Sequence, residues 1–131
     1  MNPFRKCPTT GLRVHRTADQ LIKANAVVAT VALLVGGVAA LLVLLTRWEA
    51  VLLLEAGMFY RMLTIHGMNM LIFFIIFFEM AVLYFASAVL LNCRVPAPKT
   101  GWIAFVLMVV GTLMVEWTMW TGRADVLFTS Y

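Results

Sequence analysis

The fold is decided by a charge-free run, ANAVVATVALLVGGVAALLVLLT, at residues 24–46. A bilayer core about 30 Å thick is crossed by about 20 consecutive apolar residues in a helix, so this run predicts a membrane span. Two further apolar runs follow at residues 62–93 and 100–122, and each contains one acid and no Lys or Arg. The sequence therefore predicts an all-α membrane fold with three transmembrane helices, at about 21–46, 58–91 and 101–121.

The composition supports the same class of protein. The 131 residues are 63% hydrophobic and 12% charged, with a mean hydropathy of +0.96, which lies outside the range of soluble globular proteins. Residues 1–20 are polar and lack the apolar core and cleavage site of a signal peptide. We expect residues 1–20 to form a basic cytoplasmic tail and residues 21–131 to form the transmembrane portion, with a helix N-cap near Thr17 or Asp19.

The basic residues predict the orientation of the chain, because cytoplasmic loops carry an excess of Lys and Arg. Seven of them lie in the tail, at the start of the first span and in the loop after the second: Arg5, Lys6, Arg13, Arg16, Lys23, Arg94 and Lys99. Three lie on the other side: Arg47, Arg61 and Arg123. The N-terminus is expected to face the cytoplasm and the C-terminus the outside. This asymmetry explains the net charge of +4 and argues against a nucleic-acid partner.

Two other features concern packing and thiols. Small residues recur at Ala32, Gly36 and Ala40, a spacing that lets two helix backbones approach closely in lipid. The first span is therefore expected to be scaffold that packs against a neighbouring helix. Cys7 and Cys93 have no Cys-x-x-Cys spacing, so we expect inert, reduced thiols rather than a zinc site or a haem attachment site.

The chemistry is expected in the second span, at His66. Ionisable residues inside a membrane are costly and usually functional, and histidine is a common ligand of haem iron. At about 100° per residue, Tyr84 returns to the face of His66, while Asn69 and Ser87 lie about 60° away, which predicts a sparse polar stripe. Gly67 removes a side chain beside the imidazole and would let a flat macrocycle approach. The alternative is that His66 only forms a hydrogen bond with a neighbouring helix.

Three charged residues are further candidates. Glu79 lies about 20 Å deeper than His66 along a helix, where it either handles protons or is a neutral acid hydrogen-bonded to an adjacent helix. Glu116 is expected near the outer surface, paired or solvated, since interfacial tryptophans follow it. Arg61 lies one and a half turns before His66, where it would meet a haem propionate or extend to the lipid headgroups.

Residues 60–70, YRMLTIHGMNM, resemble the start of the second helix in subunit I of the haem–copper oxygen reductases. The likeness continues through the aromatic-rich span and the basic loop to DVLFTSY at residues 125–131, so it covers roughly residues 20 to 131. It implies that the chain is part of a bundle of about twelve helices. It also implies that His66 is an axial ligand of the low-spin haem, with proton translocation as part of the activity of the complete enzyme.

The subtype follows from where the chain departs from the A-type oxidases. Those enzymes have a glycine-rich, Asn-containing stretch and a long loop after this helix. Here the stretch reads FEMAVLY at residues 78–84, and the loop spans only residues 92–100. This departure favours a B-type enzyme or a relative on the nitric oxide reductase branch.

The resemblance also defines what the chain lacks. It has two histidines, whereas the family needs further histidines for its second low-spin ligand, its high-spin haem and its copper. We therefore expect an N-terminal portion of subunit I, as a split subunit, a truncated product or an isolated segment, that cannot reduce oxygen alone. The expected partners are the remaining helices, subunit II, an electron donor (a cytochrome c, a copper protein or a quinol) and the lipid of a bacterial or archaeal cytoplasmic membrane.

Two other functions remain open at this stage. The chain could be a small non-catalytic membrane subunit that acts as a packing partner in a respiratory complex, with His66 only hydrogen-bonded. It could also be a homodimeric cytochrome b in which two copies of His66 hold one haem.

Overall fold

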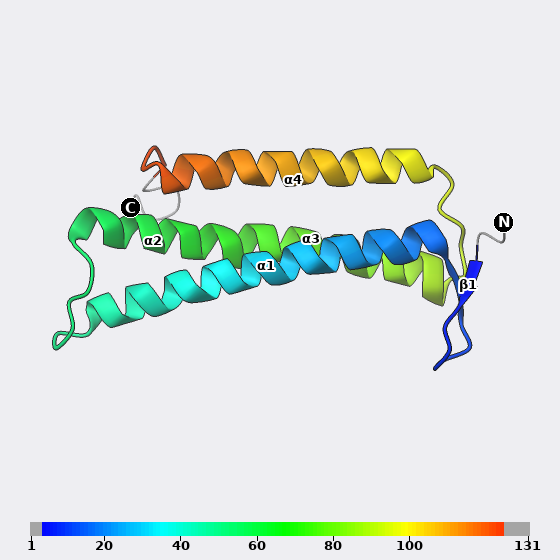
Figure 1. Cartoon of the computed structure of the whole chain (residues 1–131), viewed down its shortest axis with the longest axis horizontal. Coiled ribbons are helices and arrows are strands. Elements are labelled where there is room, and N and C mark those ends of the chain that lie inside the picture. Colours follow the sequence, from blue (N-terminus) through cyan, green and yellow to red (C-terminus); the bar gives the residue numbers. More distant parts are fainter. Residues whose placement is uncertain (1–3, 125–131) are drawn as a thin grey trace.

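The computed structural model describes residues 4–124, in which long helices run side by side (Figure 1). Among these residues, three helices are long and apolar enough to cross a membrane, which confirms the prediction from the apolar runs. The first is α1 (Arg16–Arg47) and the last is α4 (Pro98–Trp120). The second spans Ala56–Leu90 without a break. It consists of α2 (Ala56–Gly67), the π-helical η1 (Met68–Phe73), α3 (Phe74–Phe85) and the π-helical η2 (Ala86–Leu90).

The segment expected to be a tail is a β-hairpin followed by the first turn of α1. Strand β1 (Phe4–Lys6) pairs antiparallel with β2 (Arg13–His15), and Phe4 lies opposite His15. The turn closes through hydrogen bonds between Cys7 and Leu12 and between Gly11 and Cys7, each 2.9 Å long. Gly11 has a φ of +68°, which glycine adopts without steric cost. The Pro-Thr-Thr-Gly sequence before Leu12 was the signal for this turn.

Helix α1 begins at Arg16, before the start predicted for the first span at about residue 21. Its N-cap is His15 rather than Thr17 or Asp19. Asp19 lies instead in the first turn, where a carboxylate is stabilised by the helix dipole. It accepts hydrogen bonds from Arg5 at 3.1 Å and Lys23 at 2.9 Å. The pair with Arg5 ties the hairpin to the helix, and the pair with Lys23 lies within α1. The DVLFTSY segment that carries part of the family resemblance lies outside the described residues.

Helix α1 packs along the second long helix through small side chains. Ala29, Ala32, Gly36 and Ala39 are buried, which confirms that this span packs against a neighbour. The contact is closest at Gly36, where an added Cβ would lie 2.8 Å from Met70 Cγ and 3.1 Å from Asn69 Cβ. Because lipid is as apolar as the helices, such close van der Waals contact is a main source of helix association in a membrane.

Helix α4 packs more loosely than the other two spans. Pro98 occupies its first turn, where a missing N–H costs no hydrogen bond. Met119 is its only fully buried residue, and the large side chains Ile103, Leu107, Leu113 and Trp117 are exposed. Such side chains suit contact with lipid or with further helices.

Two adjacent glycines provide a test of the close approach at α1. Gly36→Leu is expected to lower the free energy of unfolding by about 1–3 kcal/mol, because the new side chain overlaps Met70 and Asn69. Gly37→Leu is the matched control, since nothing lies within 4 Å of a Cβ at that position. Thermal unfolding of the full chain in mild detergent, followed by circular dichroism, measures both. Equal destabilisation by the two variants would contradict the close contact.

Candidate functional site

His66 lies in the last turn of α2 and faces α1. Its Nδ1 is 2.9 Å from the carbonyl oxygen of Gly36, and the residue is half-buried. The carbonyl can only accept, so a neutral ring donates its Nδ1–H and keeps Nε2 as an unprotonated acceptor. Metal-bound histidines usually have this arrangement, in which a backbone carbonyl holds one ring nitrogen and the other binds the metal.

The surroundings of His66 are compatible with a planar cofactor. A Cβ added at Gly67, the next residue, would have no neighbour within 4 Å, and the same holds for Gly37 on α1. The backbone next to His66 is therefore open at Gly67, about 100° around the helix from the imidazole. No cluster of three or more His, Cys, Asp or Glu side chains capable of holding a metal occurs among residues 4–124. An imidazole that keeps one ring nitrogen as an acceptor is a group that haem iron takes as an axial ligand, so the residue type at this position fits one side of a haem site.

A π-helical turn begins immediately after this site. In η1 the backbone N–H of Phe74 bonds to the carbonyl of Asn69, five residues back. Because a π turn holds more residues than an α turn, angles counted at 100° per residue fail beyond Met68. The predicted polar stripe is accordingly divided. His66 contacts α1, whereas Asn69 bonds to α4 and the hydroxyl of Tyr84 lies 3.2 Å from the Cβ position of Gly101 on α4.

The fourth member of the predicted stripe, Ser87, is exposed, and among residues 4–124 its hydroxyl forms no hydrogen bond with another helix. It donates instead to the carbonyls of Leu83 and Tyr84 in its own helix, at 2.8 and 3.3 Å.

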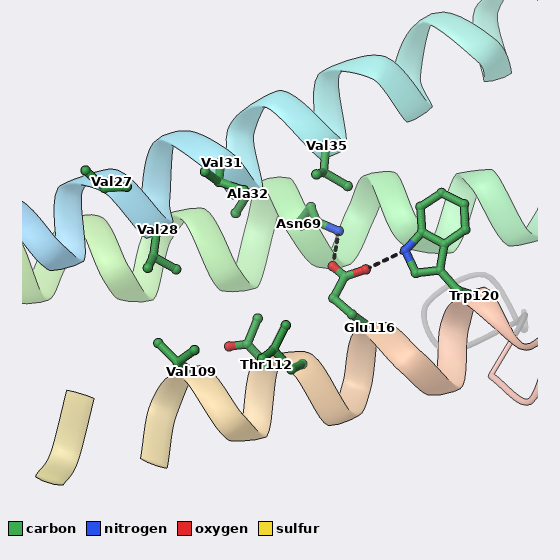
Figure 2. Close-up of a pocket in the computed structure, with 11 residues that line it drawn as sticks. Val27, Val28, Val31, Ala32, Val35, Asn69, Val109, Thr112, Glu116 and Trp120 are labelled. Atoms are coloured by element: carbon green, nitrogen blue, oxygen red, sulfur yellow. Dashed lines mark hydrogen bonds between the residues drawn. The ribbon is translucent and has the colours of Figure 1, made fainter. Parts of the chain in front are cut away.

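Glu116 joins α4 to the second long helix. Its Oε1 accepts a hydrogen bond of 2.6 Å from Asn69 Nδ2, and its Oε2 accepts one of 2.9 Å from Trp120 Nε1 (Figure 2). Asn69 also donates to the carbonyl of Ile65 at 3.0 Å. The sequence indicated a paired or solvated Glu116, but it gave no signal for Asn69 as the partner, which lies 47 residues away on another helix.

A cavity of about 380 Å³ adjoins this network between α1 and α4. Its wall is almost entirely apolar, with Val27, Val31 and Val35 of α1 on one side (Figure 2). The Glu116 carboxylate and the Asn69 amide are the polar groups at one end. The cavity explains why α4 packs loosely along its middle.

Arg61 is directed towards the end of α4. A Cβ added at Gly122 would lie 2.9 Å from its Cζ, so the guanidinium packs over the backbone there. Gly122 has a φ of +73° and follows the last helical residues of α4, where glycine commonly ends a helix. Pairing of Arg61 with a haem propionate or with lipid headgroups stays a prediction.

Glu79 lies on an exposed face of α3, beside the exposed side chains of Ile76, Phe78 and Val82. No hydrogen bond or ion pair joins it to any other residue within 4–124. The helices of this chain therefore do not supply the hydrogen-bond partner that one interpretation required. Its role in proton handling stays a prediction.

Cys7 differs from the inert thiol that its sequence context indicated. The Thr10 hydroxyl, together with the backbone N–H groups of Thr10 and Thr9, stabilises the thiolate and lowers the pKa of Cys7 to about 7. A substantial fraction of this thiol is therefore ionised near neutral pH.

The comparisons with known proteins give one match. The family model described as Cytochrome C and Quinol oxidase polypeptide I matches residues 20–131. No curated protein and no solved structure matches the chain.

The Glu116 network can be tested with an isosteric change. In Glu116→Gln the amide offers its oxygen to only one of the two donors, so one bond is lost at a cost of about 1–3 kcal/mol. Adding Trp120→Phe removes one donor, and we expect the double variant to be more stable than the sum of the single changes. Thermal unfolding of the full chain measures all three, with Glu49→Gln in the exposed loop as the control. Strict additivity would contradict the network.

Proposed function

The chain belongs to the family of cytochrome c and quinol oxidase polypeptide I, and from this membership we propose that His66 is one axial ligand of the low-spin haem in a haem–copper terminal oxidase. The family match covers residues 20–131, which include the His66 site, two of the membrane-capable helices in full and all but the first four residues of α1. The chain is accordingly an integral membrane protein of the haem–copper oxidase subunit I family. Within that family we assign it to the N-terminal part of the subunit I bundle.

One observation supports the assignment of His66 most directly. The Gly36 carbonyl engages Nδ1 at 2.9 Å, so the chain holds the ring in place and leaves Nε2 for the iron. The absence of a side chain at Gly67 keeps the adjacent space open. A haem held by two histidines is six-coordinate and supplies one-electron transfer rather than oxygen binding.

The remaining parts of the proposal concern the rest of the enzyme. The second axial histidine, the high-spin haem and the copper would be held by helices outside residues 4–124. Electrons would arrive from a cytochrome c, a copper protein or a quinol, with subunit II as a further partner. The short loop after η2 favours the B-type or nitric oxide reductase branch. A bacterial or archaeal cytoplasmic membrane is the location that we propose.

The arrangement of basic residues supports an inward-facing N-terminus. The hairpin and the loop between η2 and α4 lie at the same end of the helices (Figure 1). The seven basic residues lie in these two segments and near the adjoining starts of α1 and α4, so they share one side. Arg47 and Arg61 lie towards the other end, where α1 ends and α2 begins. Under the positive-inside rule, the hairpin end faces the cytoplasm and the C-terminus faces outward.

The second candidate function is a non-catalytic packing subunit of a respiratory complex. The same His66–Gly36 hydrogen bond favours it, because a histidine satisfied by a neighbouring helix needs no metal. The two functions differ at Nε2, which binds iron in the first and only solvent, lipid or protein in the second.

Replacement of His66 distinguishes the two functions. In the assembled complex, His66→Ala is expected to abolish the low-spin haem band of the reduced-minus-oxidised spectrum and to lower the haem content. His15→Ala, which removes the other histidine of the chain, is expected to retain both signals. An unchanged spectrum in His66→Ala would establish the packing function instead.

A second pair of variants keeps this test independent of His66 itself. Gly67→Leu fills the open space beside the imidazole and should lower the haem content, whereas Gly111→Leu adds the same side chain to an exposed part of α4 with nothing within 4 Å. Full haem content in Gly67→Leu would argue against a porphyrin at this face.

The orientation is tested with the two native thiols. Cys7 and Cys93 should resist a membrane-impermeant maleimide in intact cells and react after permeabilisation, because both lie at the cytoplasmic end. In a variant with both cysteines replaced by serine, Glu49→Cys should react in intact cells. Labelling of Cys93 from outside would reverse the proposed orientation.

A further inference from the structure

The β-hairpin carries a concentration of positive charge that its own residues do not neutralise. Residues 4–23 contain five basic side chains, Arg5, Lys6, Arg13, Arg16 and Lys23, against one acid, Asp19. Asp19 is shared between Arg5 and Lys23. Among the described residues, no acidic side chain pairs with Lys6 or Arg13.

The strand register places two of these cations directly opposite each other. Lys6 on β1 is the cross-strand partner of Arg13 on β2. Like charges in directly opposite positions destabilise an antiparallel pair. An anion bound between Lys6 and Arg13 would offset this repulsion. The Arg13 guanidinium also lies 4.9 Å from the centre of the Phe4 ring, a cation–π contact that holds it on this side of the hairpin.

The same residues surround a cavity. A pocket of about 250 Å³ is lined by Phe4, Arg5, Lys6 and Arg13, so three of its four lining residues are cationic. A phosphate group is small enough for this volume and matches these donors, because guanidinium binds phosphate oxygens in a bidentate manner and ammonium binds them as a point charge.

The position of the hairpin indicates where the phosphate comes from. Strand β2 packs against η2 and runs directly into α1, so the pocket lies where two membrane-spanning helices end (Figure 1). Leu12 in the turn is 45% exposed and suits contact with the apolar edge of the headgroup layer. Basic segments beside a membrane span attract anionic lipids at this level.

We propose that the hairpin binds the phosphate of an anionic phospholipid headgroup between Lys6 and Arg13. Arg5, which follows Phe4 on the other face of β1, pairs with Asp19 and fixes the hairpin to the start of α1. Bound lipid relieves the repulsion between the two cross-strand cations and thereby orders the hairpin against the membrane surface.

The experiment measures lipid selectivity of the full chain. The chain is reconstituted in phosphatidylcholine vesicles containing spin-labelled phosphatidylglycerol or spin-labelled phosphatidylcholine, and electron paramagnetic resonance gives the fraction of immobilised lipid. The unchanged chain should prefer phosphatidylglycerol. Lys6→Gln/Arg13→Gln should weaken this preference on the order of tenfold, since each basic group contributes separately to the attraction.

The matched control removes the same charge from the same side of the membrane. Arg94→Gln/Lys99→Gln lies in the loop before and at the start of α4, outside the pocket, and should keep most of the preference. Lys6→Arg/Arg13→Lys preserves the charges and should also keep it. Equal loss in both charge-removing variants, or no preference in the unchanged chain, would overturn the site.

A second measurement separates a lipid from free phosphate. In neutral detergent, phosphatidylglycerol is expected to raise the unfolding temperature of the chain, and inorganic phosphate at the same concentration is not. An equal rise with inorganic phosphate would overturn the lipid as the ligand. None of these variants touches His66, so failure here leaves the proposed haem ligand unaffected.

Discussion

The structure depends on the close contact between α1 and the second long helix at Gly36. Hydrocarbon provides no hydrophobic force to join two apolar helices, so close backbone packing has to hold them. The absence of a side chain at Gly36 brings Met70 and Asn69 against α1. The same approach exposes the Gly36 carbonyl to His66 Nδ1. One glycine therefore both joins the helices and orients the imidazole.

The spans could be predicted from the sequence because a missing charge over 20 or more residues is a strong signal. His66 could be predicted as a site for a related reason, since an ionisable group in such a run is rare. The hydrogen-bond partners of the polar side chains in the spans could not be predicted. The link between Asn69 and Glu116 depends on how α4 is placed against the second long helix. The π turn was also unpredictable, because no residue type within Met68–Phe73 marks it.

The hairpin was missed for a different reason. Its two strands have three residues each, which is too short for alternation of polar and apolar residues to be visible. The Pro-Thr-Thr-Gly sequence before Leu12 is typical of a turn, but the polar and basic composition of the segment favoured a tail. For Arg61 the position in the membrane was predictable and the contact was not. Its position near the outer end was clear, but its contact with Gly122 depends on how the C-terminal end of α4 is placed.

The π turn at Met68–Phe73 has one more consequence. A π turn is equivalent to one extra residue inserted into an α-helix. The side chains before the turn and those after it are therefore rotated relative to one another, compared with a continuous α-helix. The outer half, α2, contacts both α1 and α4 and places the imidazole against the Gly36 carbonyl, while the inner half, α3, packs mainly against α1. The residues before and after the turn therefore meet their neighbouring helices in separate registers, so a substitution that rotates one half need not turn the other.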